Sequence, residues 1–213
     1  MVVNILDFEK AATLAEYVRI WNEKGWSPAT STNYSFRNDD EFIAISKSGI
    51  DKSKFVPNDF LLLNPKTESL HELYAGKYRS SAETGLHTVL YRLDTSVEAI
   101  VHTHSVYDTI LSQYYWNRGK KSIILENYEV LKALGFNTHD ISLEVPIFEN
   151  TQDIPVLAKS FAQRFVESPQ IKGYLIAGHG FYTWGRSIEE AKRHLEAFQF
   201  LFECEYKRLL LPK

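Results

Sequence analysis

Two histidines lie two residues apart at the end of an apolar run, in the stretch AIVHTH that closes with His102 and His104. Residues two apart in a strand point to the same face, so the two imidazoles would lie side by side while Thr103 points away. A borderline cation such as Zn²⁺ takes nitrogen ligands, and a catalytic site needs three protein ligands and an open position. The candidate third ligand is His179, which lies near the end of a second apolar run, YLIAGHG.

The surroundings of His179 favour this interpretation. Gly178 and Gly180 flank it and lack a Cβ, so the backbone and a ligand could approach an ion closely. A His-X-His pair alone is also typical of two hydrogen-bonded or half-exposed imidazoles, but two strand ends of one sheet can converge on a shared rim. The other four histidines fall in polar loops or predicted helices and are interpreted as structural or solvated: His71, His87, His139 and His194.

A divalent metal with three neutral ligands keeps its full charge, which suits it to stabilise the enolate formed when a C–H beside a carbonyl is deprotonated. Such chemistry also needs a group that moves protons. The candidates are Glu83, in SSAETGLH at the start of a predicted helix, and Glu129, in ENYEVLKALG. The ordinary role of a glutamate is a surface ion pair, and periodicity alone does not select these two among 27 acidic residues.

Small hydroxyl residues and glycine collect in three stretches, PATSTN (28–33), SKSG (46–49) and RSSAE (79–83). Hydroxyls, backbone N–H groups and a helix N-terminus are the usual components of a phosphate site, although no P-loop spacing is present. The alternative is ordinary turn chemistry, which composition alone favours.

The elements that must position these residues follow from hydrophobic periodicity and turn signals. Strands and helices alternate along the chain, which indicates an α/β or α+β layered domain. Strands are predicted at SFR, EFIAIS, FLLL, EAIVHTH and LEVPIFE, and a strand, turn and strand at GYLIAGHGFYTWG. Helices are predicted from Asp7 to about Glu23, over Ser80–Leu93, Val106–Trp116 and Asp153–Val166, and as a short helix over Asn127–Leu134.

A last helix is predicted to begin at a capping box formed by Ser187 and Glu190 and to run nearly to the C-terminus. Phe200 lies opposite its apolar stripe, either as a scattered exposed aromatic or as a subunit contact. The stripe consists of Ala191, Leu195, Phe198, Phe202, Tyr206 and Leu209.

Length and composition bound the class of protein. The chain has 213 residues with 44% apolar content, which suits one domain over residues 1–213. A net charge of −3 with interspersed signs predicts no nucleic-acid partner, so small molecules or further copies of the chain are expected. Cys204 is the only cysteine, which excludes an internal disulfide. Neither a signal peptide nor a membrane span is recognisable, and a cytoplasmic protein is expected.

Four stretches, GWSPATSTNYSFR, AIVHTHS, EVPIFENT and GHGFYTWGRSIEEAKRHLEAFQFLFE, together resemble the zinc-dependent class II aldolase and adducin-head superfamily. Within it they resemble the methylthioribulose-1-phosphate dehydratases of methionine salvage. The resemblance runs in order from roughly Glu16 to Glu205. The two histidine motifs mark the superfamily, whereas PATSTN, PIFENT and HGFYTWG point to the dehydratase branch.

The resemblance implies that the three candidate histidines bind zinc and that Glu129 is the general acid/base. Glu83 matches a carboxylate that acts as a base in the aldolases, although the dehydratases vary there. Tyr128 falls where some aldolases have a proton-donating tyrosine and is a second candidate acid. Thr32 stands where many relatives have glycine, which weakens an expectation of positive φ. The implied phosphate site consists of Ser31, Asn33, Ser46, Ser48, Gly49 and Ser81, with Lys52 as a weaker candidate.

The implied fold is a three-layer α/β/α domain with a central, largely antiparallel sheet, and the implied assembly is a homotetramer with sites near subunit contacts. The implied activity is that of a hydro-lyase, the zinc-dependent dehydration of 5-methylthioribulose 1-phosphate to 5-methylthio-2,3-diketopentyl 1-phosphate. One alternative is an aldolase or epimerase acting on another sugar phosphate, with Glu83 as the base. Another is a non-catalytic module like the adducin head, which has no need for three histidines.

Overall fold

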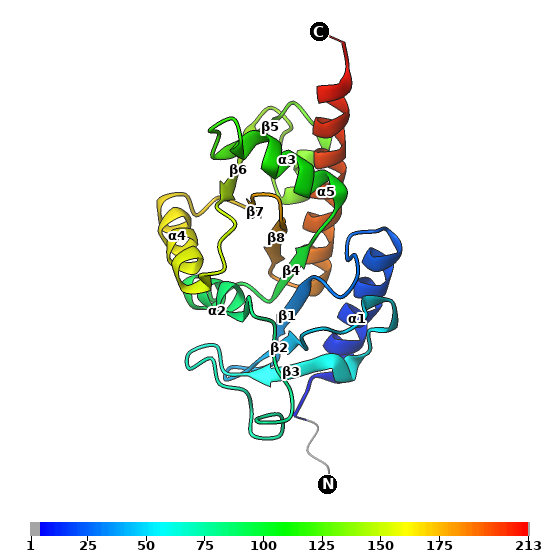
Figure 1. Cartoon of the computed structure of the whole chain (residues 1–213), viewed down its shortest axis with the longest axis vertical. Helices are drawn as coiled ribbons and strands as arrows, with labels where there is room; N and C mark the ends of the chain where they lie inside the picture. The colour runs from blue at the N-terminus through cyan, green and yellow to red at the C-terminus, as the bar shows by residue number, and fades with distance from the viewer. Residues whose placement is uncertain (1–4, 213) are drawn as a thin grey trace.

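The strands form one eight-stranded sheet in the computed structural model, which describes residues 5–212 (Figure 1). Its order is β3-β2-β1-β4-β8-β7-β6-β5, and only β6 and β7 pair in parallel. The strands are β1 (Asn33–Arg37), β2 (Ile43–Ser46), β3 (Phe60–Leu63), β4 (Ala99–Thr103), β5 (Ser122–Glu126), β6 (Ser142–Phe148), β7 (Gly173–Ile176) and β8 (Gly180–Gly185).

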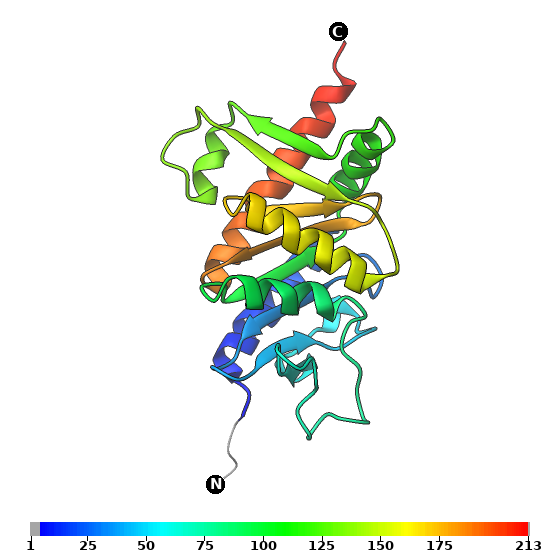
Figure 2. The ribbon, with the colours of Figure 1, turned by 90° about the vertical axis from the view of Figure 1, so that its left-hand side faces the viewer.

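Helices cover both faces of this sheet, and each face has its own apolar core. Figure 2 shows α2 and α4 side by side on one face and α5 on the other. The predicted three-layer α/β/α fold with a largely antiparallel sheet is therefore confirmed. The first core lies under α1 (Phe8–Glu23), α3 (Val106–Trp116), α5 (Ile188–Leu210) and the 3₁₀ helix η3 (Glu129–Leu134). The second core lies under α2 (Thr84–Leu93) and α4 (Ile154–Glu167). Two short 3₁₀ helices, η1 (Lys52–Lys54) and η2 (Pro57–Asp59), precede β3.

Alternation along β4 decides on which face the histidine pair lies. Val101 belongs to the core under α1 and α5, whereas Ile100 belongs to the core under α2 and α4. Because side chains in a strand alternate with a period of two, His102 shares the face of Ile100. The strand is apolar on both faces because helices cover both. The pair of imidazoles is thereby directed towards α2 rather than towards α5.

Helix α5 is held by the predicted N-cap but not by the full predicted box. The Ser187 hydroxyl accepts from the backbone N–H of Glu190 at 3.1 Å. The Glu190 carboxylate accepts from the backbone N–H of Arg186 instead of that of Ser187, so the predicted capping box is only half formed. The apolar stripe packs into or against the core up to Tyr206, whereas Leu209 is 39% exposed. Within residues 5–212, no helix is both long and apolar enough to span a bilayer.

Two local expectations differ from the structure. Helix α2 begins at Thr84 rather than at Ser80, because the residues before it form a turn in which the Ser81 hydroxyl accepts from the backbone N–H of Glu83 at 3.2 Å. Strand β5 was not predicted. It is the edge strand beyond β6, and Ile124 on its outer face is 44% exposed, so its apolar pattern is weak.

Candidate metal centre

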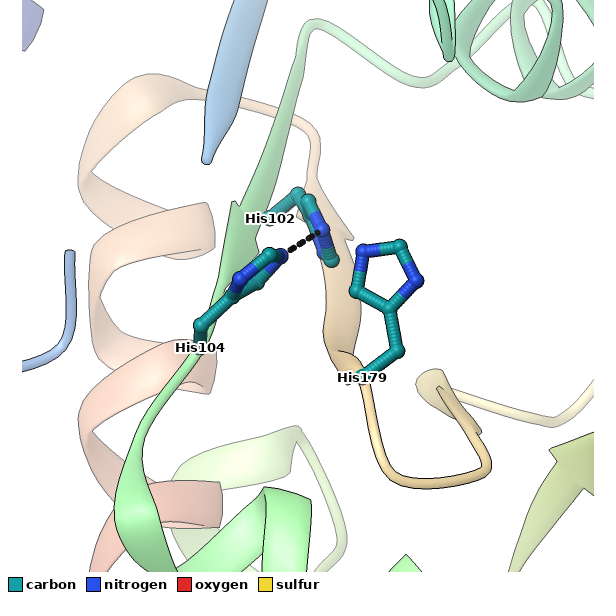
Figure 3. Close-up of side chains that lie close together, drawn as sticks. All are labelled: His102, His104 and His179. Carbon is teal, nitrogen blue, oxygen red and sulfur yellow. Dashed lines mark hydrogen bonds between the residues drawn. The ribbon is translucent and has the colours of Figure 1, made fainter. Parts of the chain in front are cut away.

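The three candidate histidines meet at one edge of the sheet. Strands β4 and β7 both pair antiparallel with β8 and therefore run in the same direction, so their C-terminal ends share an edge. His102 lies in β4, His104 directly follows it, and His179 lies in the turn between β7 and β8. Figure 3 shows the three rings facing a common point from these two segments. The sequence could propose this meeting, but only the strand order produces it.

The geometry of the rings fits a metal ion. One ligand atom from each histidine lies within 4.8 Å of the others, and the Nε2 atoms of His102 and His104 are 2.7 Å apart. The Nδ1–H of His102 donates to the backbone carbonyl of Phe181 at 3.0 Å, which leaves Nε2 with a free lone pair. A ligating histidine is typically oriented in this way, by donating its other ring N–H to a carbonyl.

The backbone beneath the rings is tightly packed. The His102 ring stacks on Tyr182, with centroids 3.9 Å apart. A Cβ placed on Gly180 would lie 2.6 Å from Cδ2 of His104 and 2.9 Å from Cε1 of His102, so a side chain cannot fit there. Gly178 has a different reason, because its φ of +64° lies in the left-handed region that glycine adopts freely. Packing therefore requires glycine at 180, and the backbone conformation favours glycine at 178.

Glu83 lies beside the histidines, as sequence reasoning proposed. Its Oε1 is 3.1 Å from Nε2 of His179, and its Oε2 is 3.4 Å from Nε2 of His102. Oε2 also accepts from the Asn33 amide at 2.7 Å and from the Tyr182 hydroxyl at 2.8 Å. A carboxylate held in this way can bind a metal ion or accept a proton from a molecule bound beside it.

Burial sets the protonation of this cluster. Desolvation holds the pKa of His102 well below its ordinary value and lowers the pKa of His104 to about 4. Both rings are therefore neutral near pH 7, which is the form that binds a metal. Burial alone would raise the pKa of Glu83, but the surrounding His102, His179 and Tyr182 outweigh it and hold the pKa well below the ordinary value. Three imidazoles and one carboxylate are a donor set that suits Zn²⁺.

Two residues that position Glu83, Tyr182 directly and His87 through Asn33, were not assigned to the site by sequence reasoning. Tyr182 pairs with His102 across β4 and β8, so its role follows from strand register alone. His87 in α2 is fully buried, and its ring nitrogens bond to the Ser35 hydroxyl and to the Asn33 side-chain carbonyl. Its interpretation as a structural histidine agrees with this burial, although the residue that it orients belongs to the site.

A cavity of about 300 Å³, here called the hydroxyl cavity, opens onto His104, His179 and Glu83. Of the six predicted phosphate residues, Ser46 does not line it, because its hydroxyl is buried under the sheet and accepts from the backbone N–H of Tyr34. Sequence reasoning missed Thr151 and Gln152, which follow β6 and also line it. The predicted phosphate residues that do line it are Ser31, Asn33, Ser48, Gly49 and Ser81.

The structure also decides the expectations for Thr32 and Lys52. Thr32 has a φ of +75°, so the doubt about positive φ at this position was wrong. Its hydroxyl accepts from the Tyr34 hydroxyl at 2.9 Å, a bond that glycine could not make. Lys52 does not line the hydroxyl cavity. It is fully buried, donates to the Ile50 carbonyl at 3.0 Å, and has its pKa lowered by burial to about 8.

Glu129 and Tyr128 lie at the opposite ends of the strands from the histidines. Strand β5 runs opposite to β6, β7 and β4, so its C-terminal end, which leads into η3, points away from the histidines. Figure 2 shows η3 and α3 at opposite ends of the strands. The Glu129 side chain is 70% exposed and contacts Lys132 at 2.7 Å and His139 at 3.2 Å. The Tyr128 hydroxyl donates to Glu205, and burial with this bond raises the pKa of Tyr128 to about 12. Within one chain, neither residue joins the cluster.

Comparisons with known proteins agree with this arrangement. The family model described as the class II aldolase and adducin N-terminal domain matches residues 12–206. A methylthioribulose-1-phosphate dehydratase of Marinobacter nauticus is 45% identical over 200 residues, 93% of each chain. One of Serratia proteamaculans is 46% identical over 190 residues, covering 89% of this chain and 90% of that protein. The crystal structure of an L-fuculose-1-phosphate aldolase of Thermus thermophilus superposes with a TM-score of 0.69 at 22% identity, covers 95% of each chain and shows the shared fold.

Proposed function

The chain belongs to the class II aldolase and adducin N-terminal domain family, and from this membership we propose that it is a hydro-lyase of methionine salvage. Its substrate is 5-methylthioribulose 1-phosphate, and its product is 5-methylthio-2,3-diketopentyl 1-phosphate, which is the substrate less one molecule of water. This is the activity for which the two bacterial relatives are named. The observation that carries the proposal is the cluster of three imidazoles and one carboxylate beside a cavity lined by hydroxyl groups.

Members of this family typically depend on a metal ion, and we propose zinc as the ion, bound by His102, His104 and His179. When bound, zinc acts as a Lewis acid that polarises the C2 carbonyl of the substrate and stabilises the charge that develops there. Metal analysis of the purified protein tests its identity. One zinc per chain supports the proposal, and loss of zinc in His102→Ala tests the ligand set.

The remaining steps fall to the side chains. We propose that the Glu83 carboxylate takes the proton from C3, and that the electron pair of the broken C–H bond forms a C2–C3 enediolate. The C4–O bond then breaks as an acid protonates the departing hydroxyl, which leaves as water. The resulting C3–C4 enol takes up a proton at C4 and releases the proton of its C3 hydroxyl, which gives the 2,3-diketone. Glu83 suits the first step because it is ionised and held by Asn33 and Tyr182 beside the candidate ligands.

The phosphate of the substrate is proposed to occupy the hydroxyl cavity. Its walls offer the hydroxyls of Ser31, Ser48 and Ser81 and the backbone of Gly49, which are groups that donate to phosphate oxygens. Lys47 also lines the cavity, although its ammonium lies 3.6 Å from Asp59. Phosphorylated sugars are intermediates of cell metabolism, and the proposed location of the enzyme is the cytoplasm.

We propose Glu129 as the acid of the second step, acting in the site of a neighbouring copy within a homotetramer. Its exposure and its place at the far edge of the sheet leave it free to reach another subunit but not its own histidines. Cyclic assemblies bring different surfaces of identical chains together, so a residue from one edge can meet a site at the other.

The activity is tested directly with zinc-loaded protein and 5-methylthioribulose 1-phosphate, with products identified by mass spectrometry. One product lighter than the substrate by water is expected. Cleavage into two carbon fragments would make the protein an aldolase instead. Unchanged substrate would end the assignment.

Mixing two inactive variants tests whether Glu129 acts across subunits. Glu83→Gln and Glu129→Gln should each lose most of their turnover while keeping metal. After unfolding and refolding together, about a quarter of the sites would combine an intact Glu83 with an intact Glu129 from a neighbour, since each is present with even odds. Activity should return to that level. No recovery in mixed oligomers would place both glutamates in the same chain's site or remove Glu129 from the reaction.

A further inference from the structure

A second cavity also borders the candidate metal centre. It has a volume of about 440 Å³ and shares His104 and His179 with the hydroxyl cavity. It is called the apolar cavity here, because no acidic or basic side chain other than these two histidines lines it. Its remaining lining residues are Pro28, Ser105, Val106, Thr109, Ile110 and Gly178.

The polar groups of the apolar cavity already have partners. The Ser105 hydroxyl accepts from the backbone N–H of Asp108 as the N-cap of α3. The Thr109 hydroxyl donates to the backbone carbonyl of His179 at 3.1 Å. The backbone N–H of Gly178 donates to the Ser112 hydroxyl at 3.0 Å. Apart from the two histidine rings, a molecule entering this cavity therefore meets mostly hydrocarbon.

The same bonds fix an apolar surface beside His179. Two hydrogen bonds tie α3 to the turn at residues 178 and 179. They fix the solvent-facing residues Val106 and Ile110 beside His104 and His179. Val106 and Ile110 are four residues apart and share that face of the helix. Their side chains are 63% and 40% exposed, so a bound group can still bury apolar surface on them. Exposed aliphatic side chains next to a polar centre gain free energy from such burial.

We propose that the apolar cavity is the subsite for the methylthio group of the substrate, with Val106 and Ile110 as its specificity-determining residues. The inference rests on the proposed function. In the open-chain ketose the phosphate is on C1 and the methylthio group on C5, so the two groups leave the C2–C4 centre in opposite directions. With the phosphate in the hydroxyl cavity, C5 points past His104 and His179 into the apolar cavity.

The test measures binding rather than turnover. The probes are 5-methylthioribitol 1-phosphate and 5-deoxyribitol 1-phosphate, which carry an alcohol in place of the C2 carbonyl and cannot be dehydrated by this route. They differ only in the methylthio group. Isothermal titration calorimetry on the zinc-loaded protein should show the methylthio probe binding about tenfold tighter or more, the scale of discrimination that a small apolar group brings in a hydrophobic pocket.

The double variant Val106→Thr with Ile110→Gln should reduce this ratio to near one by weakening the methylthio probe alone. Threonine preserves the shape of valine, and glutamine is a good helix former, so α3 is preserved. Zinc content should stay at one per chain. Matched controls are Val156→Thr and Val166→Gln in α4, which are 55% and 70% exposed and line neither cavity. These controls should keep the wild-type ratio.

Three outcomes overturn the subsite. One is equal binding of both probes by the wild-type protein, a result that does not depend on any variant folding. Another is equal weakening of both probes in the double variant, which would indicate a general change at the metal centre. The third is the same loss of the ratio in the controls. Failure of the proposed function has a different signature, because the wild-type protein would then bind neither probe, and the subsite would fail with it.

Discussion

At the scale of single residues, environment separates side chains of the same type. Glu83 is 14% exposed and held between an amide, a phenol and two imidazoles, whereas Glu129 is 70% exposed and paired with a lysine. The first has the surroundings of a reacting group, and the second lies away from the histidines of its own chain. Asp108 is a third case, since it is fully buried behind the centre and accepts from Gln199 at 2.9 Å.

The stability of the fold should depend on the titration of Asp108. Burial raises the pKa of Asp108 to about 7, above its ordinary value of 3.8, while bonds from Gln199 and Ser105 oppose the shift. The folded protein therefore holds a proton that the unfolded chain releases between pH 4 and pH 7, and stability falls as pH rises through that range. Three pKa units correspond to about 4 kcal/mol.

Asp108→Asn removes this titration. Between pH 5 and pH 8, its free energy of unfolding should fall by about 2–3 kcal/mol less than that of the wild type, as urea unfolding would measure. Asp140→Asn, which changes an exposed carboxylate, is the control and should behave as the wild type. Parallel pH profiles for Asp108→Asn and the wild type would show that Asp108 is ionised in the folded protein.

At the scale of elements, β1 and α2 hold Glu83 through a buried chain of bonds. The His87 ring bonds to Asn33 in β1, and the Asn33 amide then donates to Glu83 at the start of α2. Burial lowers the pKa of His87 to about 3, so the ring is neutral, and the Asn33 carbonyl accepts from its Nε2–H. The Asn33 side chain is thereby fixed with its NH₂ group towards the carboxylate.

His87→Leu should free Asn33 and lower kcat by roughly tenfold to a hundredfold, the usual cost of losing a residue that orients a metal-site group. Zinc content should be retained, since His87 is not a candidate ligand. His87→Gln can still donate to Asn33 and should recover part of the rate. A fall in thermal stability with kcat unchanged would instead make His87 a purely structural residue.

At the scale of the whole molecule, the candidate metal centre lies at one end of the strands of the sheet and η3 lies at the opposite end. The single-domain organisation over residues 1–213 and the homotetramer stay predictions. The exposure of Phe200 is consistent with a homotetramer, because this residue is 51% exposed on the side of α5 that faces away from the core. A large exposed aromatic gains free energy when a neighbouring subunit covers it.

Phe200→Ser should therefore weaken assembly and lower the mass of the particle, measured by light scattering after size-exclusion chromatography. Val166→Ser removes an apolar side chain that is 70% exposed on α4 and serves as the control, with the assembly expected to stay intact. An unchanged mass in Phe200→Ser would return this residue to the class of scattered surface aromatics.

Most elements were predictable, because their signals are local. The stripe of α5, the N-cap Asp7 of α1 and the alternation in the central strands each depend on residues a few positions apart. Strand β5 and the true start of α2 were not predictable in this way. An edge strand is stabilised by its pairing with β6, and the turn before α2 by the bonds of Ser81, so both depend on partners that periodicity does not reveal.

The sequence by itself determined the three candidate metal ligands, because a histidine pair at the end of an apolar run and a glycine-flanked histidine are visible in the letters of the chain. Only the tertiary structure decided which other residues join them. The histidines meet because β4 and β7 run in the same direction on either side of β8, and bonds from Asn33 and Tyr182 hold Glu83 beside them. Ser46 and Lys52 are buried in other contacts and do not line the hydroxyl cavity. Strand direction and register are set by long-range pairing free energies, and these are a property of the folded chain rather than of any short segment.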